Sequence, residues 1–361
     1  SSPIVLRLAM PSNQPNISEL RQDRVSGEWV VVATGRAKRP HDFTHKKPEP
    51  AVPKTDCPFE ILIPNAGIAY DRAGKTLGAP PSESAAASDQ WWVQVIPNKY
   101  PALTQHVECA VERSVGPYAV QDGVGFHDVI VTRDHDRSIG RMTAAEAAVV
   151  VRAYRDRYLA IKGDGCVKYI SIFHNHGRDA GASVAHPHSQ MIALPVIPPG
   201  VSQSLVGSMA WWHRTARCVH CTMIAFEQEQ KTRVVYENDQ FLVICPFASR
   251  QAFEMRLFPK NHSPRFEAIT DDGLSAAGDA LQQALARLDV GLNDPPYNFF
   301  IHTAPASDGE MEERYHWHLE ILPKTAVWAG FEIGTGIEIS TIAPESAAEF
   351  LRGVKRETQD H

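Results

Sequence analysis

The same succession of patterns occurs twice along the chain, and this duplication restricts the folds that it can adopt. Each half has a short cysteine-containing segment, then strand-like apolar runs, one helical pattern, and a last strand-like run that contains His-x-His. These last runs include residues 186–190, which read His-Pro-His-Ser-Gln, and residues 316–320, which read His-Trp-His-Leu-Glu. We therefore expect two copies of one structural unit within the 361 residues.

The apolar periodicity predicts the elements of each copy. Runs of apolar and β-branched residues predict strands, and apolar positions spaced by three or four residues predict helices. In the first half, strands are expected at 92–97, 128–132, 169–173 and 190–193, and a helix at 143–161. In the second half, strands are expected at 241–245, 253–258, 297–301 and 316–321, and a helix at 272–288. Consecutive strands with one helix between them favour an α+β fold with antiparallel sheets.

A proline-rich stretch at residues 195–200 separates the halves and is typical of a linker. We expect an N-terminal domain at residues 1–200 and a C-terminal domain at 201–361, with a further helix at 202–215. A chain of this length is sufficient for two domains of ordinary size.

Composition and charge exclude several classes of protein. The content of 43% hydrophobic and 22% charged residues is that of a globular protein. No apolar run approaches the roughly 20 residues that span a bilayer, and residues 1–10 lack a signal-peptide pattern, so we expect a cytoplasmic protein without a membrane partner. The net charge of -6 argues against a general binder of nucleic acid polymers, because such proteins need a basic surface.

Two imidazoles are expected on one side of the strand-like segment 186–190. Side chains at i and i+2 of an extended segment point the same way, so His186, His188 and Gln190 share a face. One imidazole can be fixed by a metal or a hydrogen bond while the other meets a substrate. The glycines and alanines of residues 177–182 form a small-residue turn where a phosphate can approach backbone amides. This combination indicates nucleotidyl transfer; the alternative is a solvated strand with two structural histidines.

Cys218 and Cys221 form a close thiolate pair, which is typical of a tetrahedral zinc site. Two more ligands must come from elsewhere in the fold, and His262 and His316 are the candidates at the ends of later strands. The alternative is a pair of reduced cysteines without a metal.

The first half has a weaker counterpart, in which Glu60 stands at the second thiolate position after Cys57. His135 and His186 are the candidate partners. A carboxylate is a harder ligand than a thiolate and often leaves a zinc site weaker or open. A metal bound here would fix His186 and the strand that carries His188, and would support catalysis without being the reagent. The alternative is a lost site with a solvated Glu60.

The other three cysteines, Cys109, Cys166 and Cys245, lie in apolar or mixed segments and are expected to be buried thiols. Six cysteines in a chain of this length are too few and too scattered for a disulfide framework.

Taken together, these segments resemble the galactose-1-phosphate uridylyltransferase family, the transferase branch of the histidine triad superfamily. The likeness covers nearly the whole chain and rests on residues 19–21, 27–33, 36–40, 57–59, 97–101 and 186–190. The second half is most similar to a short-chain branch that includes plant ADP-glucose phosphorylase, on residues 293–298, 316–317 and 330–336. The resemblance implies two histidine-triad-like repeats whose antiparallel sheets join, with helices packed on them, a homodimer and covalent catalysis.

The resemblance also assigns catalytic roles. His188 is implied as the nucleophile and His186 as a metal ligand. Gln190, Ser183 and Asn175 match positions that contact the transferred phosphate. A neutral imidazole can attack phosphorus without a separate base, because its unperturbed pKa is about 6.5.

Further matching positions concern the substrate. Arg36 and Arg39 match paired arginines that suit anionic phosphates, although a solvated basic turn is the alternative. Asn98 matches a nucleoside-contacting position, but its neighbour Lys99 stands where uridylyltransferases carry an acid, so the base preference stays open. In the implied homodimer, residues near Phe331 and Glu332 of the partner chain would complete the active site.

The expected function is exchange of UMP between UDP-glucose and galactose 1-phosphate, or a close hexose 1-phosphate, in a ping-pong reaction through a nucleotidyl-histidine. The first alternative is an ADP-glucose phosphorylase, which transfers AMP to inorganic phosphate. A small hydrolase of the histidine triad type is disfavoured because it has one repeat, and a non-catalytic nucleotide-binding module is the remaining class. His318 is expected to be structural, since Glu320 replaces the glutamine and the preceding loop lacks the glycine and serine turn.

Overall fold

The computed structural model describes residues 18–33, 43, 53–60, 68–77, 91–105, 108–306 and 311–354. Arg36 and Arg39 lie outside the described residues, so their roles stay predictions. Within the described part, no helix has the length and apolar character needed to cross a membrane.

One continuous antiparallel sheet runs through both halves of the molecule. In the described part of the chain it has eleven strands in the order β11-β12-β13-β15-β14-β9-β10-β8-β5-β3-β4. The first half supplies β3 (Ile68–Tyr70), β4 (Thr76–Leu77), β5 (Val93–Pro97), β8 (Phe126–Thr132), β9 (Tyr169–His176) and β10 (His188–Leu194). The second half supplies β11 (Val234–Glu237), β12 (Phe241–Ile244), β13 (Met255–Pro259), β14 (Tyr297–His302) and β15 (His318–Pro323). The halves join where β9 pairs with β14, which confirms the predicted α+β fold of two joined repeats.

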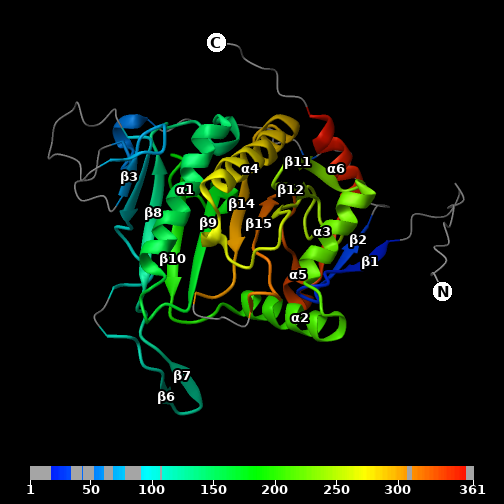
Figure 1. Cartoon of the computed structure of the whole chain (residues 1–361), viewed down its shortest axis with the longest axis horizontal. Coiled ribbons are helices and arrows are strands. Elements are labelled where there is room, and N and C mark those ends of the chain that lie inside the picture. The colour runs from blue at the N-terminus through cyan, green and yellow to red at the C-terminus, as the bar shows by residue number, and fades with distance from the viewer. Residues whose placement is uncertain are drawn as a thin grey trace, which may run out of the picture.

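Two long helices lie side by side across one face of this sheet (Figure 1). They are α1 (Ala144–Ile161) and α4 (Asp271–Leu292), each preceded by a threonine whose side chain caps the first turn. The capping box of Thr143 and Glu146 satisfies backbone N–H groups that the helix itself leaves unpaired. Gly278 permits the close approach of α4 to α1, because a Cβ at this position would lie 2.4 Å from the Ala148 nitrogen. Both helices bury their apolar faces in one core that spans the two repeats.

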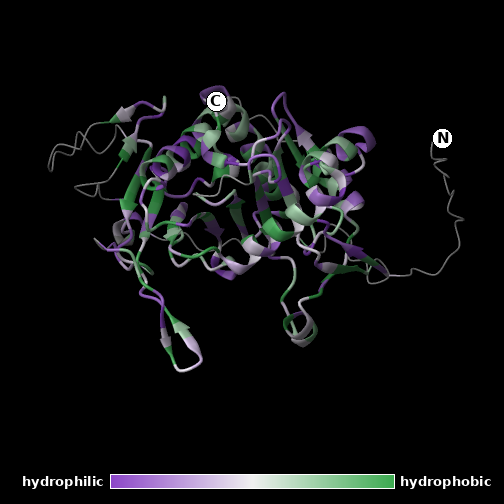
Figure 2. Cartoon of the chain, turned by 60° about the horizontal axis from the view of Figure 1, so that its bottom comes forward, coloured by the Kyte–Doolittle hydropathy of each residue, from purple (hydrophilic) through white to green (hydrophobic). Residues whose placement is uncertain are grey.

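The remaining elements lie around this layer. They are β1 (Glu19–Gln22), β2 (Trp29–Val32), β6 (Arg113–Val115), β7 (Tyr118–Val120), β16 (Glu338–Ser340), α2 (Pro199–Thr215), α3 (Val219–Gln230), α5 (Gly330–Thr335) and α6 (Pro344–Gly353). Short 3-10 helices lie at Lys54–Asp56, Ile139–Arg141, Arg178–Ala180 and Phe266–Ala268. The β6–β7 hairpin projects from the body, as Figures 1 and 2 show. The helix predicted at 202–215, directly after the linker, is present as α2, whereas the sequence patterns missed α3.

The N-terminal strands belong spatially with the C-terminal end of the chain. Strand β2 pairs with β1 on one side and, in parallel, with β16 on the other. In the turn after β1, Asp23 accepts a hydrogen bond of 2.7 Å from Arg256 on β13. Residues 19–32 therefore pack on second-half strands, and the predicted division at residue 200 stays a prediction.

Cys109 and Cys166 form a disulfide, so the prediction of buried thiols is wrong for both. Cys109 is exposed and Cys166 half-buried, and their bond ties the segment before the β6–β7 hairpin to the turn after α1. Their separation of 57 residues hid this pairing in the sequence. Cys245 is a buried free thiol, as predicted.

Candidate active site

His188 begins β10 with a fixed tautomer. Its Nδ1 lies 2.8 Å from the carbonyl oxygen of His186, and because a carbonyl only accepts, Nδ1 carries the hydrogen. Nε2 then holds the lone pair, and it has no hydrogen-bond partner among the described residues. Burial lowers the pKa of His188 below its ordinary value, so the ring is neutral at pH 7. The chain thus presents a neutral, oriented imidazole nitrogen.

The ring of His188 packs beside Phe59, and the next residue of the strand, Ser189, anchors β10 to its neighbours. The Phe59 ring lies 5.2 Å from the His188 ring, centroid to centroid. On the opposite face of β10, the Ser189 hydroxyl bonds to the Tyr154 hydroxyl of α1 and lies 3.0 Å from His174 Nδ1. This anchoring of β10 to α1 fixes the strand that carries His188.

Gln190 is oriented by His127, a residue that the sequence patterns did not indicate. The backbone N–H of Ala102 donates to His127 Nδ1 over 3.0 Å, so Nε2 of this neutral ring carries the hydrogen. Nε2 lies 2.9 Å from Gln190 Oε1 and donates to it. The amide hydrogens of Gln190 are then available to a ligand beside His188. Asn98 Nδ2 lies 3.0 Å from the same ring nitrogen, which places the predicted nucleoside-contacting residue next to Gln190.

Asn175 is brought to the same region by the junction of the repeats. Asn298 of β14 donates to Asn175 Oδ1 over 2.8 Å and to the Ala180 carbonyl over 2.7 Å. Asn298 therefore fixes both the Asn175 side chain and the small-residue turn, a role that the sequence did not indicate. Gly177 in this turn has a φ of 79°, and a Cβ there would lie 2.9 Å from Pro296.

Ser183 is exposed in the loop that leads from this turn to His186. Phe331 and Glu332 lie instead on α5, with the second-half elements and away from β10 (Figure 1). Phe331 is 47% exposed, and no residue of α5 is buried. Within one described chain these two residues do not reach His188, so their predicted substrate contact requires a second chain and stays a prediction.

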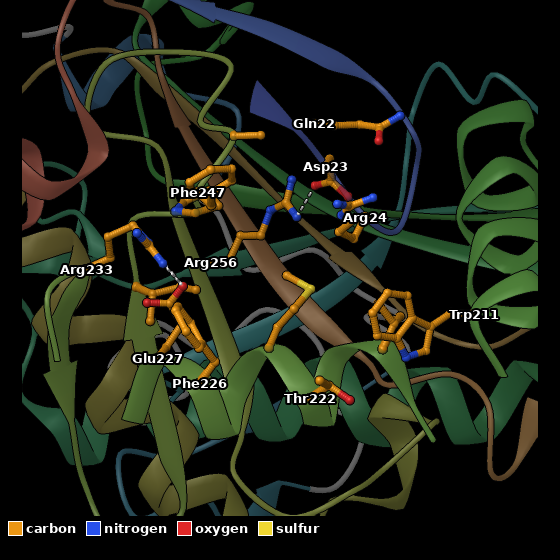
Figure 3. Close-up of a pocket in the computed structure, with 15 residues that line it drawn as sticks. Gln22, Asp23, Arg24, Trp211, Thr222, Phe226, Glu227, Arg233, Phe247 and Arg256 are labelled. Atoms are coloured by element: carbon orange, nitrogen blue, oxygen red, sulfur yellow. Dashed lines mark hydrogen bonds and ion pairs between the residues drawn. The ribbon is translucent and has the colours of Figure 1, made fainter. Parts of the chain in front are cut away.

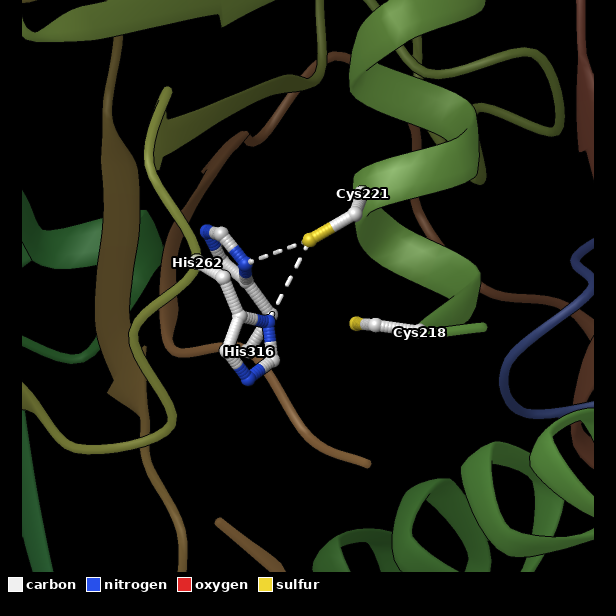
Figure 4. A group of neighbouring side chains, drawn as sticks. All are labelled: Cys218, Cys221, His262 and His316. Carbon is white, nitrogen blue, oxygen red and sulfur yellow. Dashed lines mark hydrogen bonds between the residues drawn. The ribbon is translucent and has the colours of Figure 1, made fainter. Parts of the chain in front are cut away.

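The predicted zinc ligands of the second half converge, as Figure 4 shows. Donor atoms of Cys218, Cys221, His262 and His316 all lie within 4.8 Å of one another. His262 Nε2 donates to the Glu312 carbonyl over 2.8 Å, and His316 Nε2 donates to the Pro259 carbonyl over 2.9 Å. Each ring thus turns its Nδ1 toward the Cys221 sulfur. Two thiols and two oriented imidazoles match the donor set of a tetrahedral zinc site.

The first-half group also converges, but its carboxylate is already engaged. Donor atoms of Cys57, Glu60, His135 and His186 lie within 4.8 Å of one another. His186 Nε2 donates to the Thr132 carbonyl over 2.7 Å, and its Nδ1 lies 3.4 Å from the Cys57 sulfur. Glu60, however, accepts from His135 over 2.7 Å and pairs with Arg133 over 3.2 Å. This group fits a metal, and its internal hydrogen bonds also hold it together without one.

The second repeat has a cluster of ion pairs at the position where the first repeat has His188 and Gln190. His318 Nδ1 donates to the His316 carbonyl over 3.1 Å, as His188 does to His186. Its Nε2, however, lies 3.4 Å from Glu320 Oε1. Burial opposes the ionisation of Glu320, but Arg250 and Arg256 hold its pKa well below the ordinary value. His302, His318 and Glu320 form a further group of possible metal donors, and its only carboxylate is engaged in ion pairs with both arginines.

Comparison with known proteins gives consistent matches. A family model described as galactose-1-phosphate uridyl transferase, N-terminal domain, matches residues 10–198. An ADP-glucose phosphorylase from Arabidopsis thaliana is 36% identical over 93% of both chains. A galactose-1-phosphate uridylyltransferase from Thermotoga maritima is 27% identical over 92% of this chain and 98% of its own.

Solved structures agree with these matches. The crystal structure of the Arabidopsis thaliana ADP-glucose phosphorylase with bound ADP-glucose has a TM-score of 0.74 and 33% identity, and covers 94% of this chain and 100% of its own. A uridylyltransferase structure has a TM-score of 0.67 and 25% identity, and covers 93% of this chain and 97% of its own.

Proposed function

The chain belongs to the galactose-1-phosphate uridylyltransferase family, and from this premise we propose that it transfers a nucleotidyl group from a nucleotide sugar to a phosphate acceptor through His188. The observation that carries the proposal is the hydrogen bond from His188 Nδ1 to the His186 carbonyl. It leaves the Nε2 lone pair of a buried, neutral ring free to attack.

In the first step, Nε2 of His188 attacks the α-phosphorus of the nucleotide sugar. A phosphorus–nitrogen bond forms, the bond to the bridging oxygen breaks, and sugar 1-phosphate leaves with the bonding electrons. The Nδ1 hydrogen stays on the ring, and the His186 carbonyl stabilises the positive charge that the ring gains. A phosphate oxygen of the acceptor then attacks the same phosphorus, and the bond to Nε2 breaks.

Gln190 supports this reaction by donating to the phosphoryl oxygens as charge develops on them. Its orientation depends on His127, which occupies the amide oxygen and leaves the amide hydrogens for the substrate. Asn98 beside them supports recognition of the nucleoside. Ser183 and Asn175 flank the turn from which backbone amides can approach a phosphate.

Two substrate pairs remain candidates. Transfer of AMP from ADP-glucose to inorganic phosphate is favoured by the 36% identity to a protein named ADP-glucose phosphorylase. Transfer of UMP from UDP-glucose to a hexose 1-phosphate, the activity first expected from the sequence, is favoured by the family model. Both use His188 in the same way.

We further propose that the second-half group binds zinc and that the first-half group binds it more weakly. A zinc ion bound by Cys218, Cys221, His262 and His316 would cross-link the start of α3 to the segments that flank β13 and β15. In the first half, His186 would hold the ion and keep its own carbonyl in place for His188.

We also propose that the active chain is a homodimer in which α5 of one protomer meets the site of its partner. The apolar side chains in and before α5 are exposed in one chain, namely Val327, Trp328, Phe331 and Ile333. Such a row of exposed apolar groups is typical of a surface that another chain covers.

Initial rates with both substrate pairs test the activity. Purified protein is incubated with ADP-glucose and phosphate, and separately with UDP-glucose and galactose 1-phosphate, at several fixed acceptor concentrations. We expect parallel lines in double-reciprocal plots for one pair, as a covalent intermediate requires. Intersecting lines, or no turnover with either pair, would contradict the proposal.

A further inference from the structure

The strand register shows which residues occupy equivalent positions in the two repeats. On β8, Val129 faces Gln190 of β10, and on β13, Arg256 faces Glu320 of β15. The ring at the third position of each cysteine segment packs on the equivalent histidine. Phe59 lies 5.2 Å from His188, and His220 lies 5.0 Å from His318. The face of β13 that carries Arg256 thus corresponds to the face of the first repeat where the substrate would lie.

A pocket of about 530 Å³ opens on this face of the second repeat (Figure 3). Arg256 and Ile244 line its floor, as Val129 and Ile96 pair at the equivalent place in the first repeat. Its volume lies within the roughly 300–1,000 Å³ of pockets that take small molecules. The walls come from the turn after β1, from α2 and α3, and from the loop after β12.

Buried ion pairs close this pocket on the side toward His318, the equivalent of His188. Arg256 pairs with Asp23 over 2.7 Å and with Glu320 over 3.1 Å, and Glu320 in turn lies 3.4 Å from His318 Nε2. All of these side chains are buried. A ligand in this pocket can therefore be bound but has no nucleophile to react with.

The rest of the pocket offers what a nucleotide needs. Trp211, Phe226 and Phe247 supply aromatic faces on three sides (Figure 3). Arg24 is exposed, and its guanidinium has no hydrogen-bond or ion-pair partner among the described residues. It is suited to a phosphate.

Two buried polar atoms in the walls also lack partners among the described residues. Glu227 Oε2 is an acceptor without a donor, although Arg233 donates to the other oxygen of this carboxylate. Trp211 Nε1 is a donor without an acceptor. Hydroxyl groups of a ribose or polar groups of a base can satisfy both atoms, whereas a purely apolar ligand would leave them unpaired at a cost.

We propose that this pocket is a second, non-catalytic binding site for a nucleoside monophosphate. The base lies among the three aromatic rings, the phosphate meets Arg24, and Glu227 accepts from the sugar or base. The duplication has thus left one repeat with a reactive nucleotide site and the other with a binding site alone.

Equilibrium dialysis of the full chain with labelled AMP, and separately with labelled UMP, tests this site. We expect two moles of one nucleotide per mole of chain at saturation. Arg24→Gln should weaken one of the two binding events at least tenfold, and Gln190→Ala should weaken the other. Arg217→Gln is the matched control, because Arg217 is also exposed but lies outside the pocket.

Binding of one mole of nucleotide per chain that Gln190→Ala weakens and Arg24→Gln leaves unchanged would overturn the proposal. Equal effects of Arg24→Gln and Arg217→Gln would also overturn it, since a general charge effect would then explain the loss. A change of oligomeric state in Arg24→Gln, measured by sedimentation, would assign the pocket to a contact between chains instead. Failure of His188 to accept a nucleotidyl group would refute the proposed reaction but leave this binding result unaffected.

Discussion

The two repeats share a hydrogen bond from a histidine to the backbone, but the residues around that histidine differ. In both, the second histidine of His-x-His donates its Nδ1 hydrogen to the carbonyl two residues earlier. In the first repeat the next residue on that face is a glutamine held by His127. In the second it is Glu320, which is locked between two arginines. The fold therefore orients an imidazole in each repeat, and in our proposal the neighbouring charges determine which one can react.

The two groups of possible metal ligands also differ between the repeats. The second-half group has two thiols and two imidazoles, whereas in the first-half group a carboxylate replaces one thiol and pairs with Arg133. The repeat proposed to react is thus the one whose group is proposed to bind zinc more weakly.

Removing one thiol should affect the two metal groups unequally. We expect Cys218→Ser to abolish one equivalent of bound zinc and to lower the melting temperature strongly, because structural zinc contributes about 10 kcal/mol or more to folding. Cys57→Ser should lower the melting temperature by a smaller amount. Mass spectrometry measures the bound zinc, and calorimetry measures the melting temperature. Equal losses in the two variants would contradict the asymmetry.

Substitution of Gln190, two residues after His188, should lower activity, whereas substitution of Glu320, two residues after His318, should lower stability. Gln190→Ala should lower kcat by about 10²- to 10³-fold and leave the melting temperature nearly unchanged. Glu320→Gln should leave kcat nearly unchanged but destabilise the fold by about 3 kcal/mol, because the buried Arg256 and the half-buried Arg250 each lose one of their carboxylate partners. Steady-state rates and thermal unfolding distinguish these outcomes. A large loss of kcat in Glu320→Gln with an intact fold would refute the structural role of the second repeat.

Acid should weaken the cluster of ion pairs of the second repeat. Burial opposes ionisation of Asp23, but Arg256 and backbone N–H groups lower its pKa from 3.8 to about 2. The ionised group therefore adds about 2 kcal/mol of stability that is present above pH 4 and is lost as the pH falls to 2. We expect Asp23→Asn to be less stable than the unmodified chain at pH 7 and the difference to shrink towards pH 2. Calorimetry across this range measures it, and a constant difference would count against the ion pair.

His127 should have the smallest effect, on kcat rather than on KM. We expect His127→Leu to lower kcat about tenfold, the equivalent of one hydrogen bond of about 1.4 kcal/mol, because the Gln190 amide loses its fixed orientation. His127→Gln can place an amide donor near the same point and should recover most of the rate. If both variants lower the melting temperature and kcat together, His127 has only a structural role.

The sequence predicted the parts of the fold that depend on periodicity. Both long helices and the strands that carry His188 and His318 follow from apolar spacing, and the zinc ligands follow from a familiar cysteine spacing. Helix α3 was missed because it follows Cys218 directly and is apolar without a clear stripe.

Contacts between distant segments had no signal in the sequence. His127 orients Gln190 across two strands, Asn298 reaches Asn175 across the junction of the repeats, and Asp23 crosses from the N-terminal turn to Arg256. The Cys109–Cys166 disulfide is a further example. Disulfides persist mainly in oxidising compartments, so this bond bears on the expected cytoplasmic location, which stays a prediction.

Labelling of the protein by its substrate tests most directly our proposal that His188 alone carries the transferred nucleotide. The protein is incubated with ADP-glucose or UDP-glucose labelled at the α-phosphate, without acceptor, and is then denatured in base, where a phosphorus–nitrogen bond to histidine survives. Digestion and mass spectrometry locate the label. We expect label on the peptide that contains His188, none on the peptide that contains His318, and none at all in His188→Gly. Label on His318, or label that persists in His188→Gly, would contradict it.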